Sequence, residues 1–170
     1  MSYSPTAPVP TYPTLNVSAI VGRNGASAFE CWALTPGFEV SSEAGTAGAE
    51  VLQLGDLANA SYSVLPPRFA GGPHHAPRVQ YVLLLSGAAH VTLPNSTADM
   101  WVFGGAHGLH FAADVEGVSA YGHVTDYPSG DETRSVQIPT AGGVAPPHEV
   151  LHAGPCEHSM QLRRSLADLD

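Results

Sequence analysis

The chain has 170 residues, 44% of them hydrophobic, which is enough apolar material to fill one core of a common domain size. Six arginines, no lysine and a net charge of −9 argue against nucleic-acid or anionic-membrane partners and exclude lysine Schiff-base chemistry, including that of PLP. The sequence also has no P-loop and no dinucleotide-type glycine motif, so we expect no nucleotide cofactor. It lacks the 18-residue apolar run of a transmembrane helix.

The first elements in chain order are an arm and a series of strands. Pro5, Pro8, Pro10 and Pro13 predict an extended segment at the N-terminus, and we assign residues 1–27 to this arm. Eighteen glycines and 15 prolines favour short strands joined by tight turns. We expect nine strands, at residues 29–34, 49–55, 60–66, 79–85, 89–93, 99–104, 108–113, 118–124 and 134–139.

The C-terminal part has a different composition. Residues 141–155 are rich in glycine and proline and resemble a linker, whereas residues 159–170 (SMQLRRSLADLD) are the one expected helix. We therefore predict a single all-β domain with an arm over 1–27, a barrel over 28–140, and a linker and tail over 141–170.

Paired histidines precede the most apolar strand. His74 and His75 lie in GGPHHAPRVQYVLLLSGAAHV, residues 71–91. Side chains alternate across a strand, so we expect one face to carry His74, Ala76, Arg78, Gln80 and Val82. If that face points inward, a histidine and two polar side chains meet in the interior.

This segment resembles the first motif of the small cupins, in which His-x-His, then Glu or Gln, then Gly follow at fixed spacing. Gln80 and Gly87 stand at the Gln and Gly positions of this motif. If His74 is the first histidine, the second ligand position is Ala76; if His75 is the second histidine, the first ligand position is Pro73. The pattern is closest to a subgroup with His-x-Ala-Pro-Arg-x-Gln. Segments such as FECWALTPGFEVSS, residues 29–42, also look like small cupins of filamentous fungi, and the resemblance covers roughly residues 28–140. The resemblance implies a jelly-roll barrel and a homodimer.

A second cupin motif supplies a histidine on a later strand. Here the best match is His123 in VSAYGHVT, although the Pro-x-Gly that normally comes before it reads Ala106-His107-Gly108. The resemblance therefore implies a site at which His74, His123 and Gln80, with His75 joining or replacing His74, hold Fe, Mn, Ni or Zn. Replacing Glu by Gln removes a negative charge and weakens such a site, so metal-free use stays equally open.

Two further side chains are candidates for catalysis. Arg78 could bind a carboxylate or enolate oxygen, or it could pair structurally with Asp114 or Glu116. Tyr121, two residues before His123, could act as an acid, a base or a hydrogen-bond donor, or simply pack. Among the remaining histidines, we expect His90 to be a wall or surface residue and one of His107 and His110 to be exposed.

The cysteines and asparagines bear on the compartment. Cys31 and Cys156 have no zinc-site or redox spacing, and we favour two unpaired thiols over a disulfide. Asn16, Asn59 and Asn95 each begin an N-x-[ST] sequon, whereas the N-terminus has no secretory-signal pattern. The sequence as it stands indicates a cytoplasmic protein, and a secreted one if a signal peptide has been removed.

Two functions follow. The first is an enzyme acting on an apolar, oxygenated small molecule of polyketide or aromatic type, by metal-assisted oxygenation or by acid-base isomerisation or cyclisation. The second is a metal-free binding or storage protein, possibly extracellular. We favour the enzyme, because convergent histidines at the mouth of a barrel indicate chemistry.

Overall fold

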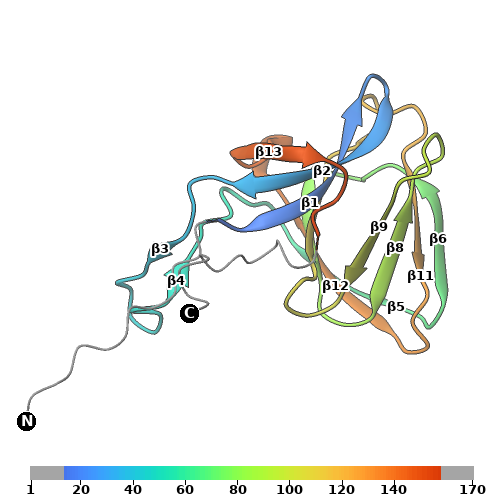
Figure 1. Ribbon diagram of the computed structural model, residues 1–170. Helices are drawn as coiled ribbons and strands as arrows, with labels where there is room; N and C mark the ends of the chain where they lie inside the picture. The colour runs from blue at the N-terminus through green and yellow to red at the C-terminus, as the bar shows by residue number, and fades with distance from the viewer. Residues whose placement is uncertain (1–13, 158–170) are drawn as a thin grey trace, which may run out of the picture.

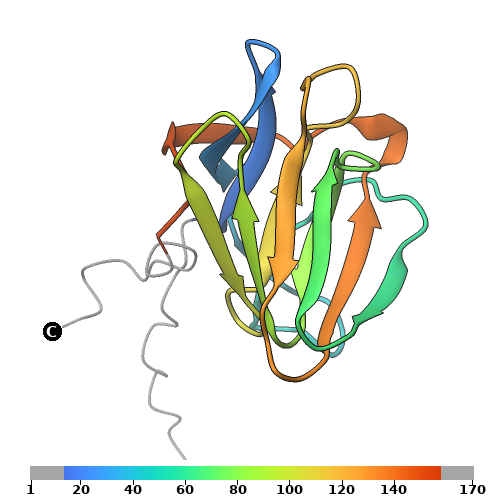
Figure 2. The same cartoon turned by 90° about the vertical axis from the view of Figure 1, so that its right-hand side faces the viewer.

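Two facing β-sheets form the body of the chain, as shown by a computed structural model that describes residues 14–157 (Figure 1). The larger sheet has seven strands, in the order β13 (His148–Ala153), β2 (Ala26–Leu34), β1 (Asn16–Arg23), β10 (Leu109–Ala112), β7 (Gln80–Leu84), β12 (Thr133–Pro139) and β5 (Ser61–Leu65). The smaller sheet, which faces the viewer in Figure 2, has the order β6 (Phe69–His74), β11 (His123–Tyr127), β8 (Ala88–Thr92) and β9 (Asp99–Phe103).

The remaining elements lie outside these sheets. Strands β3 (Glu39–Val40) and β4 (Glu50–Val51) pair as a separate small hairpin, and a single 3-10 turn covers Ala141–Gly143. None of the helices in residues 14–157 has the length and apolar character needed to cross a membrane. The all-β prediction is therefore confirmed for these residues, while the helix expected over 159–170 lies outside them.

The central strands of the seven-stranded sheet are buried on both faces, which explains the continuous apolar run in β7. Val82 and Leu84 face the smaller sheet and pack with its Val91, Met100 and Val102. Tyr81 points the opposite way, into a second cluster with Trp32, Leu34 and Phe111 that Leu52, Leu54 and Ala145 cover. Burial raises the pKa of Tyr81 to about 12, and its hydroxyl donates a hydrogen bond to the carbonyl of Leu54 at 3.0 Å. The alternation of β7 thus places Gln80 on the face that lines the space between the sheets.

Seven of the nine expected strands match observed strands of similar extent, the one expected at 49–55 shortens to β4, and the one expected at 118–124 overlaps β11 only at His123 and Val124. The structure differs in the arm, because residues 16–23 form β1 near the centre of the larger sheet, paired in parallel with β10 and antiparallel with β2. Asn24 and Gly25, both with positive φ, form the tight β1–β2 turn. The part of the arm at 1–13 lies outside the described residues.

Besides β1, two strands of the two main sheets were not expected from the sequence. The strand β6 reads FAGGPH and has low strand propensity, yet it occupies an edge of the smaller sheet and pairs with β11. Part of the predicted linker is the edge strand β13, which pairs with β2. Long-range pairing overrides local composition in both cases.

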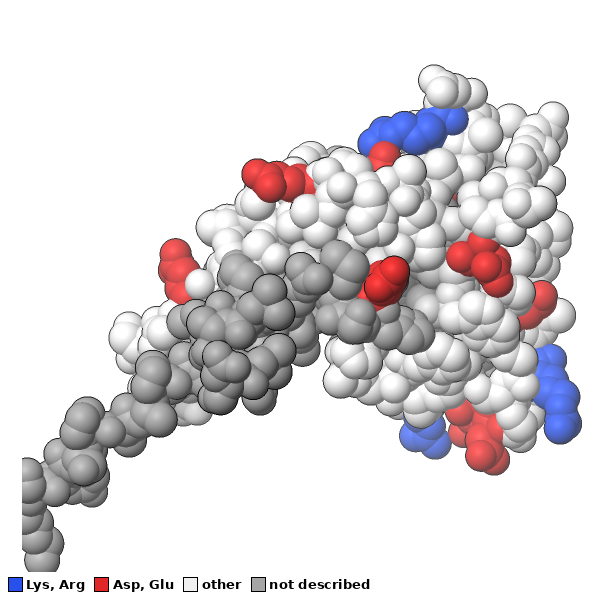
Figure 3. All heavy atoms as spheres, in the orientation of Figure 1, with Lys and Arg blue, Asp and Glu red and all other residues white. Residues whose placement is uncertain are grey.

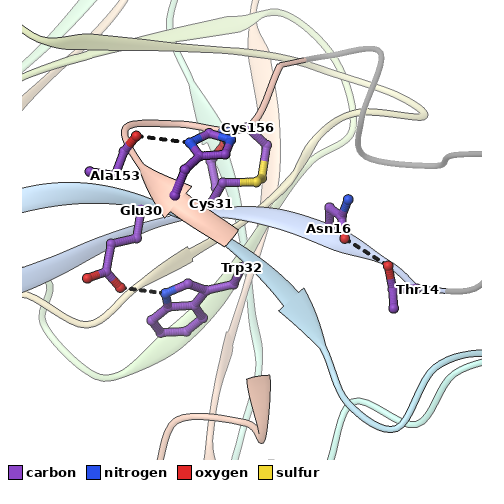
Figure 4. The surroundings of a disulfide bond; sticks show 9 residues. Thr14, Asn16, Glu30, Cys31, Trp32, Ala153 and Cys156 are labelled. Atoms are coloured by element: carbon purple, nitrogen blue, oxygen red, sulfur yellow. Dashed lines mark hydrogen bonds between the residues drawn. A yellow bond between two sulfur atoms is a disulfide. The ribbon is translucent and has the colours of Figure 1, made fainter. Parts of the chain in front are cut away.

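The prediction of two unpaired thiols is wrong. Cys31 on β2 and Cys156, just after β13, form a disulfide with a Cα–Cα distance of 4.6 Å (Figure 4). The thiols are 125 residues apart in sequence, so only the pairing of β13 with β2 brings them together. The disulfide fastens the C-terminal end of the described chain to the larger sheet.

Candidate functional site

A cavity of about 210 Å³ lies between the two sheets. Its wall combines imidazole, amide and phenol groups with small and branched apolar side chains. The lining residues are Ile20, His74, Ala76, Pro77, Gln80, Val82, Val91, His110, Ala112, His123, Thr125, Tyr127 and Gln137. His74 and Pro77 are exposed, so the cavity reaches solvent at the end of β6. The volume equals that of about seven liquid waters at ~30 Å³ each, which suits a compact ligand.

Pairing of β6 with β11 brings His74 and His123 together. The two residues are direct register partners, and their rings meet edge to face with centroids 4.4 Å apart. Gly122 makes this approach possible. A Cβ at Gly122 would overlap the carbonyl oxygen of His74 and lie 2.9 Å from the backbone nitrogen of His75, and the residue has a φ of 64°.

His123 is held from behind by a buried carboxylate. Its Nδ1 lies 2.7 Å from Oδ2 of Asp114, which is fully buried. The same Oδ2 accepts a 2.6 Å hydrogen bond from the hydroxyl of Ser27, which also contacts the hydroxyl of Ser119 at 2.7 Å. Asp114 Oδ1 has no hydrogen-bond partner within the described residues. Because a carboxylate can only accept, Nδ1 of His123 carries the proton and Nε2 is left as a proton acceptor.

His110 is a third cavity histidine, and the sequence did not indicate its role. The structure buries it on β10, in register with Val82 of β7, and its Nδ1 lies 3.4 Å from the carbonyl of Gly108. Burial lowers the pKa of His110 to about 4, with a further contribution from the nearby His123, so the ring is neutral near pH 7. The alternation of side chains along the strand could have indicated this role. His110 and Ala112 share the face of β10 that lines the cavity, whereas Leu109 and Phe111 lie on the opposite face.

All three imidazoles use Nδ1 in the same way. His74 donates from Nδ1 to the carbonyl of Gly72 at 2.9 Å, His110 does so to Gly108, and His123 to Asp114. These oxygens only accept, so each neutral ring keeps its lone pair on Nε2. The second nitrogen of each ring is therefore available as a base or a ligand.

Besides Thr125, three further polar groups line the wall. Gln80 lines the cavity as expected, although it belongs to a different strand from His74 because β6 ends at His74 and the chain bends before β7. Tyr127 lies on β11, and burial raises its pKa, so it remains a phenol that can donate a proton. Gln137 is fixed by hydrogen bonds to Ser61, Ser63 and Ser135.

Three other candidates lie elsewhere. His75 turns away from the cavity, and its Nε2 lies 2.8 Å from the carbonyl of Ser119. Arg78 is exposed in the bend before β7 and forms no ion pair within residues 14–157, so neither of its two expected partners is used. Tyr121 is 61% exposed on the loop before β11. None of the three lines the cavity. Residues 75–79 leave the strand alternation on which the expectations for His75 and Arg78 depended, and β11 begins only at His123, so Tyr121 does not share a strand face with it.

The histidine cluster does not form a ready metal site. Across the described residues, no three His, Cys, Asp or Glu side chains are placed to hold a metal ion together. The expected set of His74, His123 and Gln80 has only two imidazoles and a neutral amide, so it offers weak attraction to a hard divalent cation. These residues as they stand do not fit a metal centre.

Other surface features carry less chemistry. A hollow of about 350 Å³ beside the β3–β4 hairpin is lined by residues between Pro36 and Gln53, and includes no histidine. Over the described part of the face in Figure 3, acidic side chains lie singly and basic ones form no continuous patch.

Comparisons with known proteins leave the family open: no family model matches the chain, and no curated protein or solved structure is significantly similar to it.

Proposed function

We propose that the protein is a small-molecule enzyme that moves a proton on a compact, apolar carbonyl compound, with His123 as the general base. The single observation that carries this proposal is the buried contact between His123 and Asp114 at 2.7 Å, inside a cavity. A histidine whose second nitrogen is fixed by a carboxylate has the arrangement expected of a general base.

The cavity supplies the other groups that such a reaction needs. Nε2 of His123 takes a proton from the carbon next to the carbonyl, and the electron pair moves to the carbonyl oxygen. The phenol of Tyr127 and the amide of Gln80 are the donors available to that oxygen. Return of the proton to a different carbon gives an isomer, and attack of the enolate carbon on a second carbonyl gives a ring. Neither outcome changes the oxidation state.

The wall sets the substrate class. Ile20, Val82, Val91 and Ala112 give the cavity an apolar side, which favours a substrate whose carbon skeleton carries few charges. The neutral ring of His110 adds no positive charge near pH 7. A compact polyketide-like or aromatic carbonyl compound matches these walls.

The test is exchange of carbon-bound hydrogen in D₂O, followed by NMR with a panel of small ketones, lactones and enols. We expect the wild-type protein to speed exchange for at least one compound, and His123→Gln to lower that rate by about 10²-fold or more. The matched control is His90→Gln. His90 also contacts a carboxylate, Asp99, at 2.7 Å, but it lies on the partly exposed outer side of β8 and outside the cavity.

A binding protein is the second candidate, and the apolar wall of the cavity favours it. In that case a ligand from the panel would bind without exchange, and His123→Gln would change its Kd only modestly. Exchange that proceeds equally in wild type and His123→Gln would reject the enzyme proposal.

A further inference from the structure

The three N-x-[ST] sequons differ sharply in their surroundings. Asn59 is exposed in the loop before β5, and Asn95 is exposed in the turn that joins β8 to β9. Their hydroxyl residues, Ser61 and Thr97, are exposed as well, and the 3.2 Å hydrogen bond from Ser61 Oγ to Gln137 Oε1 lies at the surface. An asparagine must lie on an accessible loop to receive and keep an N-linked glycan, so both sites meet the physical requirement.

Asn16 fails the same requirement. It is 5% exposed on β1, in the interior of the seven-stranded sheet, and its Oδ1 accepts a hydrogen bond from Thr14 at 2.9 Å (Figure 4). The hydroxyl of this sequon has a structural task, because Ser18 Oγ accepts a 2.8 Å hydrogen bond from the backbone nitrogen of Cys156. Asn16 and Ser18 are therefore explained by folding, without any modification.

The disulfide is an independent indication of the compartment. Cys31 and Cys156 are bonded, and both are buried. Structural disulfides form and persist in oxidising compartments, which are also where N-glycosylation takes place. The disulfide and the two accessible sequons thus both indicate an oxidising compartment, although they lie on different parts of the chain.

We propose that Asn59 and Asn95 carry N-linked glycans and that Asn16 carries none. The donor is a lipid-pyrophosphate-linked oligosaccharide. A bond forms between Nδ2 of the asparagine and C1 of the first sugar, the bond from C1 to the pyrophosphate oxygen breaks, and the amide loses one proton. The lipid pyrophosphate leaves with the bonding electron pair. This proposal does not depend on the chemistry of the cavity.

The experiment uses the protein purified from its natural source and treated with peptide N-glycosidase in H₂¹⁸O, which converts each glycosylated asparagine to ¹⁸O-labelled aspartate. We expect peptide mass spectrometry to find the label at Asn59 and Asn95 and an unchanged Asn16. Absence of label at either loop site, or label at Asn16, would overturn the assignment.

Variants give a second readout when the full chain is directed into the secretory pathway of a eukaryotic cell. Asn59→Gln and Asn95→Gln should each remove one glycan step on a gel, and the double variant should run as the enzyme-treated protein does. Asn16→Gln is the matched control and should remove no step. Loss of a step in the Asn16→Gln protein, or none in the double variant, would contradict the proposal.

Discussion

His123 Nδ1 and Asp114 Oδ2 lie 2.7 Å apart, and the two side chains are 5% and 0% exposed. The contact joins β11 to the loop after β10, so the base and the group that orients it come from different parts of the chain. Ser27 on β2 donates to the same oxygen and fixes the carboxylate in turn.

Replacing Asp114 by Asn should remove most of the activity while leaving the protein folded. An amide can present its NH₂ group to Nδ1 and so favour the wrong tautomer of His123. We expect a fall in kcat of about 10²-fold or more with a smaller change in KM, and a shift of the pH profile of kcat. Far-UV circular dichroism checks the fold. Asp99→Asn, which alters the outer His90–Asp99 pair, is the matched control and should keep full activity.

Gly122→Ala should separate His74 from His123. The new Cβ overlaps the carbonyl of His74, and the φ of 64° costs an alanine roughly 1 kcal/mol even in open space. We expect the exchange rate to fall and the free energy of unfolding to drop by more than the conformational cost alone. Gly25→Ala is the control, since φ there is 79° but a Cβ meets nothing within 4 Å. Equal destabilisation by the two variants would argue against the contact with His74.

Stability should fall between about pH 6.5 and pH 4 because of His110. Its pKa is about 4 in the folded protein and about 6.5 in an unfolded chain, so below pH 6.5 the unfolded state takes up a proton that the folded state does not. The contribution of His110 to the free energy of unfolding is fully present above pH 6.5 and is lost as the pH falls toward 4. This contribution is on the order of 3 kcal/mol. Urea unfolding at pH 7 and pH 4.5 measures it. His110→Gln should flatten this part of the pH dependence, and an unchanged slope would refute the assignment.

Loss of the disulfide should destabilise the fold. Cys31→Ser with Cys156→Ser frees the end of a segment that spans 125 residues of sequence, and we expect a loss of about 2–5 kcal/mol. Urea denaturation with and without reductant checks this. The double variant should show no further response to reductant, whereas the wild type should.

Proton transfer should survive removal of metal. We expect the exchange activity to be unchanged after chelation, and elemental analysis of the untagged protein to find no stoichiometric Fe, Mn, Ni or Zn. A stoichiometric metal that is lost both on chelation and in His123→Gln, together with the activity, would favour the ligand set of His74, Gln80 and His123 instead.

The sequence by itself determined the all-β class and most of the strands, because alternation and β-branched runs are local properties. It also singled out His74, Gln80 and His123, all of which line the cavity. Only the tertiary structure decided the rest. The bend at residues 75–79 removes His75 and Arg78 from the cavity, burial at the sheet interface recruits His110, and the β13–β2 pairing joins Cys31 to Cys156. Each of these depends on strand pairing between distant segments, which the local pattern of residues does not encode.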